Sequence, residues 1–193
     1  MPDYPAEITV SPLTTPPEVR VRVPGSKSLT NRALIVAALA EGPSTLTGAL
    51  DSEDTRVMLE SLGRLGINVQ HDPGTATITL VGCKGRVKAT KADLFIANSG
   101  TSLRFLTAMV ATSRGTYRLD GTSRMRQRPV ADILQALNGL GSDARSELGT
   151  GCPPVIVKAD GLDGGFAFVK GDVSSQFLSG LLMALPYAKA TTS

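Results

Sequence analysis

The chain has 193 residues, of which 41% are apolar and 4% aromatic, with no tryptophan. The 20 basic and 17 acidic residues give a net charge of +3 without a dense basic tract, so composition favours an acidic small-molecule ligand over a nucleic-acid partner. No run reaches the ~18 apolar residues that span a bilayer, and Met1–Val10 lacks an apolar signal core, so we expect no membrane partner and a cytoplasmic location.

The predicted elements alternate between strands and helices. Strands are expected where short β-branched or alternating runs occur, and helices where apolar residues recur at i, i+4 and i+7. In chain order these are a strand over 19–23, a helix from Arg32, a helix with Met58, Leu62 and Leu65, a strand over 75–81, a helix from Arg104, a strand over 116–119, a helix with Ile133, Leu137 and Leu140, a strand over 155–157, and a helix over about 175–188. Alternating strands and helices predict an α/β fold.

The same order of elements is repeated along the chain. Arg32, Arg104 and Gln176 each open an apolar helix and stand 72 residues apart, at positions 32, 104 and 176. The second helices also recur, and Gly66 and Gly141 supply the expected stop after each. One unit therefore reads β-α-β-α-β-β, and the third unit begins near Phe166 without a second helix or closing hairpin. We interpret the chain as incomplete in its third repeat.

The starts of the three repeated helices are candidate anion-binding sites. Free N–H groups and the helix dipole favour negative charge there. Small polar residues and cations gather at these starts, namely Ser28, Ser102 and Ser174 with Lys27, Arg32, Arg104, Arg124, Arg126 and Arg128. The alternative is that the three serines are plain N-caps and the arginines are solvated. The segment Arg124–Arg128 lacks the interleaved aromatic residues of an RNA-binding patch, and its alternation lets only some guanidinium groups face one ligand.

Other chemically active residue types give weaker signals. Asp51, Asp54, Asp120 and Asp172 are interpreted as caps or turn residues. Cys83, Cys152 and His71 form no metal-ligand cluster and receive no catalytic role.

Four segments together resemble the signatures of the 5-enolpyruvylshikimate-3-phosphate synthase family (3-phosphoshikimate 1-carboxyvinyltransferase). They are Pro24–Leu34, Asn98–Arg104, Asp120–Pro129 and Gly171–Phe177, which occur in order and with family-like spacing over essentially the whole chain. The resemblance is to the N-terminal portion of the family. It implies an inside-out α/β prism, with helices inside and sheets outside. Residues 1–22 would pack with an absent second domain, and residues 23–193 would form an incomplete first domain.

The resemblance also implies an activity and a set of site residues. The family transfers the enolpyruvyl group of phosphoenolpyruvate to the 5-hydroxyl of shikimate 3-phosphate and releases phosphate, and no metal or organic cofactor is expected. Lys27 is the implied catalytic residue, between the two substrates. The implied shikimate 3-phosphate contacts are Lys27, Ser28, Arg32, Ser174, Ser175 and Gln176. The implied contacts to phosphoenolpyruvate or to the herbicide glyphosate are Lys27, Asn98, Gly100, Arg124 and Gln176.

Two features depart from the family pattern. Phe105 stands where members often have proline, which leaves glyphosate sensitivity open. The family's acid–base carboxylates come from a second half that is absent here, so we expect the fragment to be inactive alone, with that missing half as its partner. Two alternatives remain: the related enolpyruvyl transferase of cell-wall synthesis, and a non-catalytic module that binds phosphorylated ligands or RNA.

Overall fold

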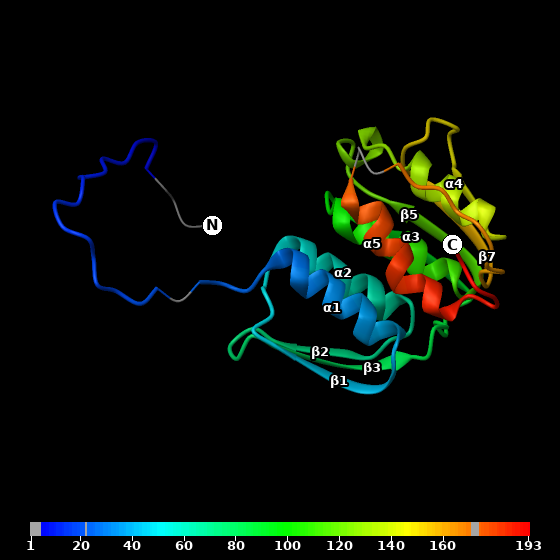
Figure 1. Ribbon diagram of the computed structural model, residues 1–193, viewed down its shortest axis with the longest axis horizontal. Helices are drawn as coiled ribbons and strands as arrows, with labels where there is room; N and C mark the ends of the chain where they lie inside the picture. The colour runs from blue at the N-terminus through cyan, green and yellow to red at the C-terminus, as the bar shows by residue number, and fades with distance from the viewer. Residues whose placement is uncertain (1–4, 22, 171–173) are drawn as a thin grey trace.

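The computed structural model describes residues 5–21, 23–170 and 174–193, and within them the chain forms two complete or nearly complete repeat units and the start of a third (Figure 1). The first unit contains α1 (Lys27–Leu39), β1 (Glu41–Thr47), α2 (Glu53–Arg64), β2 (Val69–Asp72) and β3 (Thr77–Cys83). The second contains β4 (Lys91–Phe95), α3 (Gly100–Ala111), β5 (Arg114–Asp120), a short 3-10 helix (Met125–Gln127), α4 (Ala131–Gly139), β6 (Asp143–Ser146) and β7 (Val155–Asp160). The third contributes α5 (Ser175–Ala184) and a 3-10 turn (Leu185–Tyr187). The second unit thus has the predicted order β-α-β-α-β-β, and the α/β prediction is confirmed.

The strands form two separate sheets with the same internal order. One sheet is arranged β1-β3-β2 and the other β4-β5-β7-β6. Within each, the last three strands of the unit pair antiparallel, whereas β4 adds a parallel strand beside β5. The three-stranded sheet is therefore the four-stranded sheet without its first strand.

The missing strand corresponds to the strand predicted over 19–23, and that prediction is wrong. The described residues 19–21 and 23 form no strand, and Val19, Val21 and Val23 are all exposed. The alternation alone was misleading because a strand also needs a paired edge and an apolar inner face. In the equivalent strand β4, the small apolar side chain of Ala92 faces inward. The position 72 residues earlier is occupied by the charged residue Arg20, which does not supply such an apolar inner face. Arg22, the boundary of the expected N-terminal segment, lies outside the described residues, and the pairing of residues 1–22 with a second domain stays a prediction.

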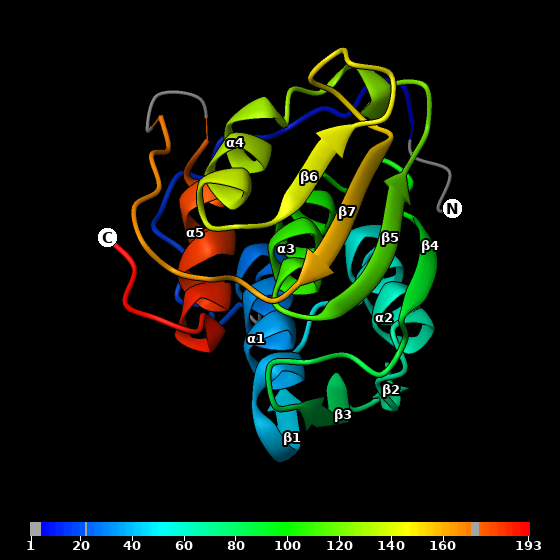
Figure 2. The ribbon, with the colours of Figure 1, turned by 90° about the vertical axis from the view of Figure 1, so that its right-hand side faces the viewer.

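The helices lie in the interior and the sheets on the outer faces (Figures 1 and 2). The repeated first helices α1, α3 and α5 contact one another, and every residue of α3 is buried. The second helices α2 and α4 turn their predicted stripes inward: Met58, Leu62, Leu65, Ile133, Leu137 and Leu140 have no exposed surface. Gly66 and Gly141 follow these helices with φ of 86° and 91°, values that favour glycine. The helix ends that the sequence predicted are therefore confirmed.

Serine caps fix where four of the helices begin. The side chains of Ser26, Ser52, Ser99 and Ser174 accept hydrogen bonds from backbone N–H groups in the first turns of α1, α2, α3 and α5. Ser28 and Ser102 lie inside their helices rather than at the caps. The interpretation as N-caps is therefore wrong for Ser28 and Ser102 and confirmed for Ser174.

Candidate anion-binding site

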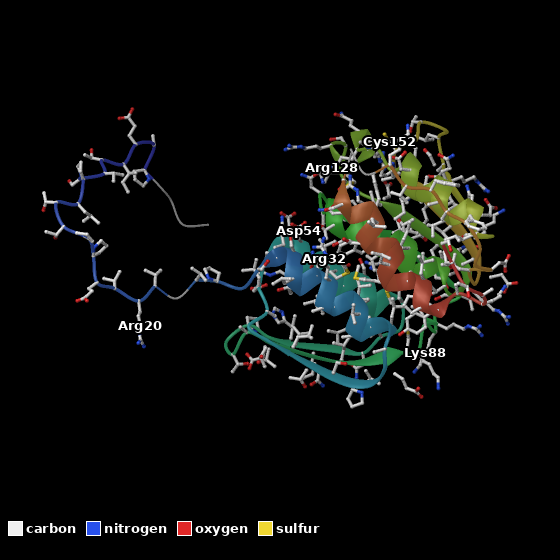
Figure 3. All side chains as sticks on the ribbon, viewed as in Figure 1. Arg20, Arg32, Asp54, Lys88, Arg128 and Cys152 are labelled. Atoms are coloured by element: carbon white, nitrogen blue, oxygen red, sulfur yellow. The ribbon has the colours of Figure 1, made fainter. Side chains whose placement is uncertain are left out.

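The starts of the repeated helices surround a cavity of about 450 Å³. Its lining comes from all three units and is strongly polar: Lys27, Glu53, Asp54, Asn98, Gly100, Thr101, Arg104, Arg128, Ser174 and Gln176. Because α1, α3 and α5 pack side by side, their N-terminal ends meet at one end of the helix layer. Figure 3 shows Asp54, Arg32 and Arg128 towards this end and Lys88 far from it.

Arg104 and Arg128, two of the cations noted at the helix starts, line the cavity, as do five of the site residues that the family resemblance implies. These are Lys27, Asn98, Gly100, Ser174 and Gln176. Ser28, Arg32 and Ser175 lie on the same helices but outside the lining: Arg32 donates hydrogen bonds to the Ser28 carbonyl oxygen and to Ser179 Oγ, each at 3.2 Å. Gly171, Asp172 and Val173 of the fourth signature lie outside the described residues.

The arginine of this segment that lines the cavity is Arg128, and the implied phosphoenolpyruvate contact of Arg124 stays a prediction. Arg124 is exposed at the start of the 3-10 helix and does not line the cavity, whereas Arg128 does. Arg126 is held by Asp120, with contacts of 2.9 and 2.6 Å between the guanidinium and the two carboxylate oxygens. The three arginine side chains therefore lie in three different environments, as their alternation suggested. The alternation did not indicate which of them faces the cavity.

Arg104 brings a nearly buried positive charge to the cavity. Its side chain donates to the Gly100 carbonyl oxygen at 3.2 Å and to Gln176 Oε1 at 3.0 Å, while its Nε is buried without a partner. Burial lowers the pKa of Arg104, and the charge of Arg128 lowers it further. No carboxylate in the described part of the chain forms an ion pair with Arg104 or Arg128. Two neighbouring uncompensated guanidinium groups favour a bound anion.

The side chains of Gln176 and Thr101 orient Arg104 through hydrogen bonds. Gln176 accepts from Arg104 and donates through Nε2 to Thr101 Oγ1 at 3.2 Å, so one side chain joins α3 and α5. The 72-residue repeat had already placed Arg104 and Gln176 at equivalent positions. Their direct contact follows from the packing of α3 on α5.

The opposite wall carries two carboxylates that the sequence interpretation undervalued. Glu53 and Asp54 occupy the first turn of α2, and Asp54 Oδ2 lies 2.6 Å from Lys27 Nζ. Asp54 was interpreted only as a helix-start residue. Its approach to Lys27 depends on the packing of α2 against α1, for which neither local sequence carries a signal.

Gly100 keeps the space in front of both arginines open. A Cβ at this position would lie 2.3 Å from Arg128 Nη1 and 2.7 Å from Arg104 Nη1. We expect Gly100→Ala to displace these flexible ends rather than the backbone, and so to weaken phosphate binding by about tenfold or more, since hydrogen bonds to charged groups are worth ~1.5–3 kcal/mol. Calorimetric titration with inorganic phosphate, beside a thermal unfolding curve, measures both effects. An unchanged phosphate affinity would show that the two guanidinium groups do not define the anion site.

The Asp120 carboxylate gives a pH-dependent contribution to stability near the site. Hydrogen bonds from Arg126 lower its pKa below the ordinary 3.8, outweighing the opposing effect of burial. A carboxyl whose pKa is depressed in the folded state stabilises the fold above its unfolded pKa, and this stabilisation is lost as the pH falls through the folded pKa. Asp120→Asn is therefore expected to lower the unfolding midpoint at pH 7, and the gap from wild type should shrink below about pH 4. A gap that stays constant from pH 7 to pH 2.5 would contradict this assignment.

The described residues contain no helix that is long and apolar enough to cross a membrane. Within the same ranges, no group of three or more His, Cys, Asp or Glu side chains is arranged to hold a metal ion.

The fold and the cavity together define an α/β repeat domain with a candidate anion-binding site at the joined ends of its first helices. The sequence matches the family EPSP synthase (3-phosphoshikimate 1-carboxyvinyltransferase) over residues 14–193. The chain belongs to this family, as its four signature segments predicted.

Relatives and a solved structure agree with the family match. The 3-phosphoshikimate 1-carboxyvinyltransferases of Burkholderia cenocepacia (strain HI2424) and Burkholderia vietnamiensis (strain G4 / LMG 22486) are 48% and 47% identical over 171 residues, which cover 88% of this chain and 39% of each relative. The structure of EPSP synthase from Acinetobacter baumannii superposes with a TM-score of 0.79 at 29% identity, covering 87% of this chain and 38% of that one. The chain thus spans about two fifths of the length of the proteins it matches.

Proposed function

We propose that this chain forms one wall of an enolpyruvyl-transferring active site that acts on phosphoenolpyruvate and shikimate 3-phosphate. The observation that carries the proposal is the cavity between the three repeated helices, where Arg104 and Arg128 lie without a carboxylate partner in the described residues. Each substrate carries a phosphate and a carboxylate, so a site for both needs a high density of cations and N–H donors.

The roles of the residues follow from their positions around the cavity. Arg128, Gly100 and Asn98 lie close together in the cavity lining and would surround the phosphoenolpyruvate phosphate, and Arg104 would add to the positive field there. Lys27, on the opposite wall, would contact both substrates and stabilise the charge that develops during transfer. Gln176 would link the phosphoenolpyruvate part of the site to the shikimate 3-phosphate part.

The second substrate would lie along the starts of α1 and α5. Ser174, which caps α5, and its neighbour Ser175 would donate to the 3-phosphate at the N-terminal end of this helix. Ser28 and Arg32 on α1 would hold the shikimate carboxylate and ring hydroxyls. In the transfer, the 5-hydroxyl oxygen gives up its proton and adds to C2 of phosphoenolpyruvate while the methylene carbon gains a proton. Loss of phosphate from C2, with a proton from the same methyl carbon, then restores the enolpyruvyl double bond.

A partner supplies the rest of the site in this proposal. Asp54 is engaged by Lys27, and proton transfer at the 5-hydroxyl and the methylene carbon needs further acid–base groups. We propose that they come from the C-terminal half of the enzyme, so that this chain alone is inactive. The cytoplasmic location expected from the sequence stays a prediction.

The test is phosphate release from phosphoenolpyruvate in the presence of shikimate 3-phosphate. The chain is assayed alone, and then mixed with the C-terminal half of a family member. We expect no release alone and release on mixing, and Lys27→Met should lower the rate of the mixture by at least about 100-fold. Release by the chain alone would contradict the division of the site. Salt-dependent RNA binding without any response to shikimate 3-phosphate would favour a nucleic-acid-binding module instead.

A further inference from the structure

Two arginines beside the cavity are supported by aromatic rings. The guanidinium carbon of Arg32 lies 5.3 Å from the centre of the Phe105 ring, and that of Arg104 lies 4.9 Å from the centre of the Phe177 ring. Both distances are within the ~6 Å over which the negative face of an aromatic ring attracts a cation. In each pair, the arginine comes from one repeat unit and the phenylalanine from the next.

The repeat generates this arrangement twice. Arg32 and Arg104 are 72 residues apart, and so are Phe105 and Phe177. Phe105 has no exposed surface and Phe177 has 1%, so both rings are held in place by the packing of the first helices. The two pairs are therefore equivalent contacts between successive units.

Six other arginines in the described residues are held differently. Their guanidinium groups pair with carboxylates, as in Arg56–Asp51, Arg64–Glu60, Arg114–Asp160, Arg118–Glu147, Arg126–Asp120 and Arg145–Asp143. Arg32 and Arg104 form no such ion pair in the described part of the chain. Of the two arginines with aromatic partners, Arg104 lines the cavity and Arg32 lies on α1 outside the lining, whereas none of the six with carboxylate partners lines it.

Whether a carboxylate or an aromatic ring holds a guanidinium group determines how much of its charge and how many of its N–H donors remain available to an anionic ligand. A carboxylate orients a guanidinium group but also occupies its N–H donors and neutralises its charge, so it competes with an anionic ligand. An aromatic ring attracts the flat face of the cation and leaves the N–H donors at its edge available. Arg32 donates one hydrogen bond to the Ser28 carbonyl oxygen and another to Ser179 Oγ, and both acceptors are neutral.

We propose that Phe105 is a positioning residue for Arg32: its ring fixes the guanidinium group beside the start of α1 while leaving the charge available to a ligand carboxylate. This inference rests on the proposed function, in which Arg32 contacts the carboxylate of shikimate 3-phosphate. Because Phe105 is fully buried, its ring would not touch the ligand and would act through Arg32. Phe177 has the same role for Arg104 in the neighbouring unit.

The test combines a spectroscopic signal with binding. In the wild-type chain, the guanidinium group of Arg32 lies over the ring, so its Nε–H proton is expected to resonate upfield, and this shift should disappear in Phe105→Leu. Titration of the same samples with shikimate 3-phosphate should show an affinity lowered about two- to tenfold, as expected for a cation–π contact of ~0.5–1.4 kcal/mol. Phe168→Leu is the matched control, because Phe168 is 86% exposed and forms neither aromatic pair.

A fluorinated ring separates charge attraction from packing. Trifluorophenylalanine at position 105 keeps the shape of the ring but weakens its negative face, so it should lower the affinity as leucine does. Loss of affinity with leucine but not with the fluorinated ring would overturn the inference, since only packing would then be involved. Absence of shikimate 3-phosphate binding by the wild-type chain would instead contradict the proposed function, and the Arg32 shift, measured without ligand, would still decide whether the ring holds the guanidinium group.

Discussion

Replacement of Arg128 by glutamine is expected to lower the affinity for phosphoenolpyruvate by about 10- to 100-fold, the range for loss of a charged hydrogen-bonding partner worth ~1.5–3 kcal/mol. Arg128 lines the cavity, lies against Gly100 and is free of carboxylate partners among the described residues. Among the described residues, the only hydrogen bond of its guanidinium group is a long one of 3.5 Å to the Asn98 carbonyl oxygen. Little of its binding capacity is therefore used inside the protein.

Arg124→Gln is the matched control for this prediction. It removes the same charge from the same segment, but Arg124 is exposed and lies outside the cavity lining. We expect its effect to stay within about twofold, as for a solvated charge at long range. Titration with phosphoenolpyruvate in the presence of shikimate 3-phosphate, at two salt concentrations, compares the variants. A larger effect at Arg124 than at Arg128 would restore the assignment made from sequence.

Leu137→Ala is expected to destabilise the fold by about 2–5 kcal/mol, the range for large-to-small substitutions in packed cores. Leu137 has no exposed surface and belongs to the stripe of α4 that packs beneath the four-stranded sheet. Removal of its branched side chain loses apolar burial and leaves a cavity that the surrounding helices and strands fill only in part. Urea unfolding followed by circular dichroism measures the change in the free energy of unfolding.

The repeat supplies an internal comparison for this substitution. Leu62 occupies the equivalent place in α2 and is also fully buried, so Leu62→Ala should lose a similar amount. Leu148→Ala, at a site that is 67% exposed, should change the free energy of unfolding by less than about 0.5 kcal/mol. A loss below about 1 kcal/mol at both buried positions would mean that the two stripes do not form the core as described.

Much of the fold could be predicted because its signals are local and repeated. The stripes of α2 and α4, the glycines that end them and the strands near residues 77–83 and 155–160 all follow from periodicity and from the conformational freedom of glycine. The strands β1, β2, β4 and β6 were missed, because they are short or contain Gly, Pro and charged residues whose pairing depends on neighbours distant in sequence.

The candidate site, like the fold, could be predicted from the sequence only in part. The sequence by itself determined the family, the repeated helix starts and the placing of Lys27, Gly100 and Gln176 at them, because these features depend on residue type and spacing along one chain. Tertiary structure decided that Arg128 rather than Arg124 faces the cavity, that Asp54 reaches Lys27 and that Phe105 lies under Arg32. Each of these is a contact between elements of different helices or units, and its geometry is set by how those elements pack, which no local pattern of residues encodes.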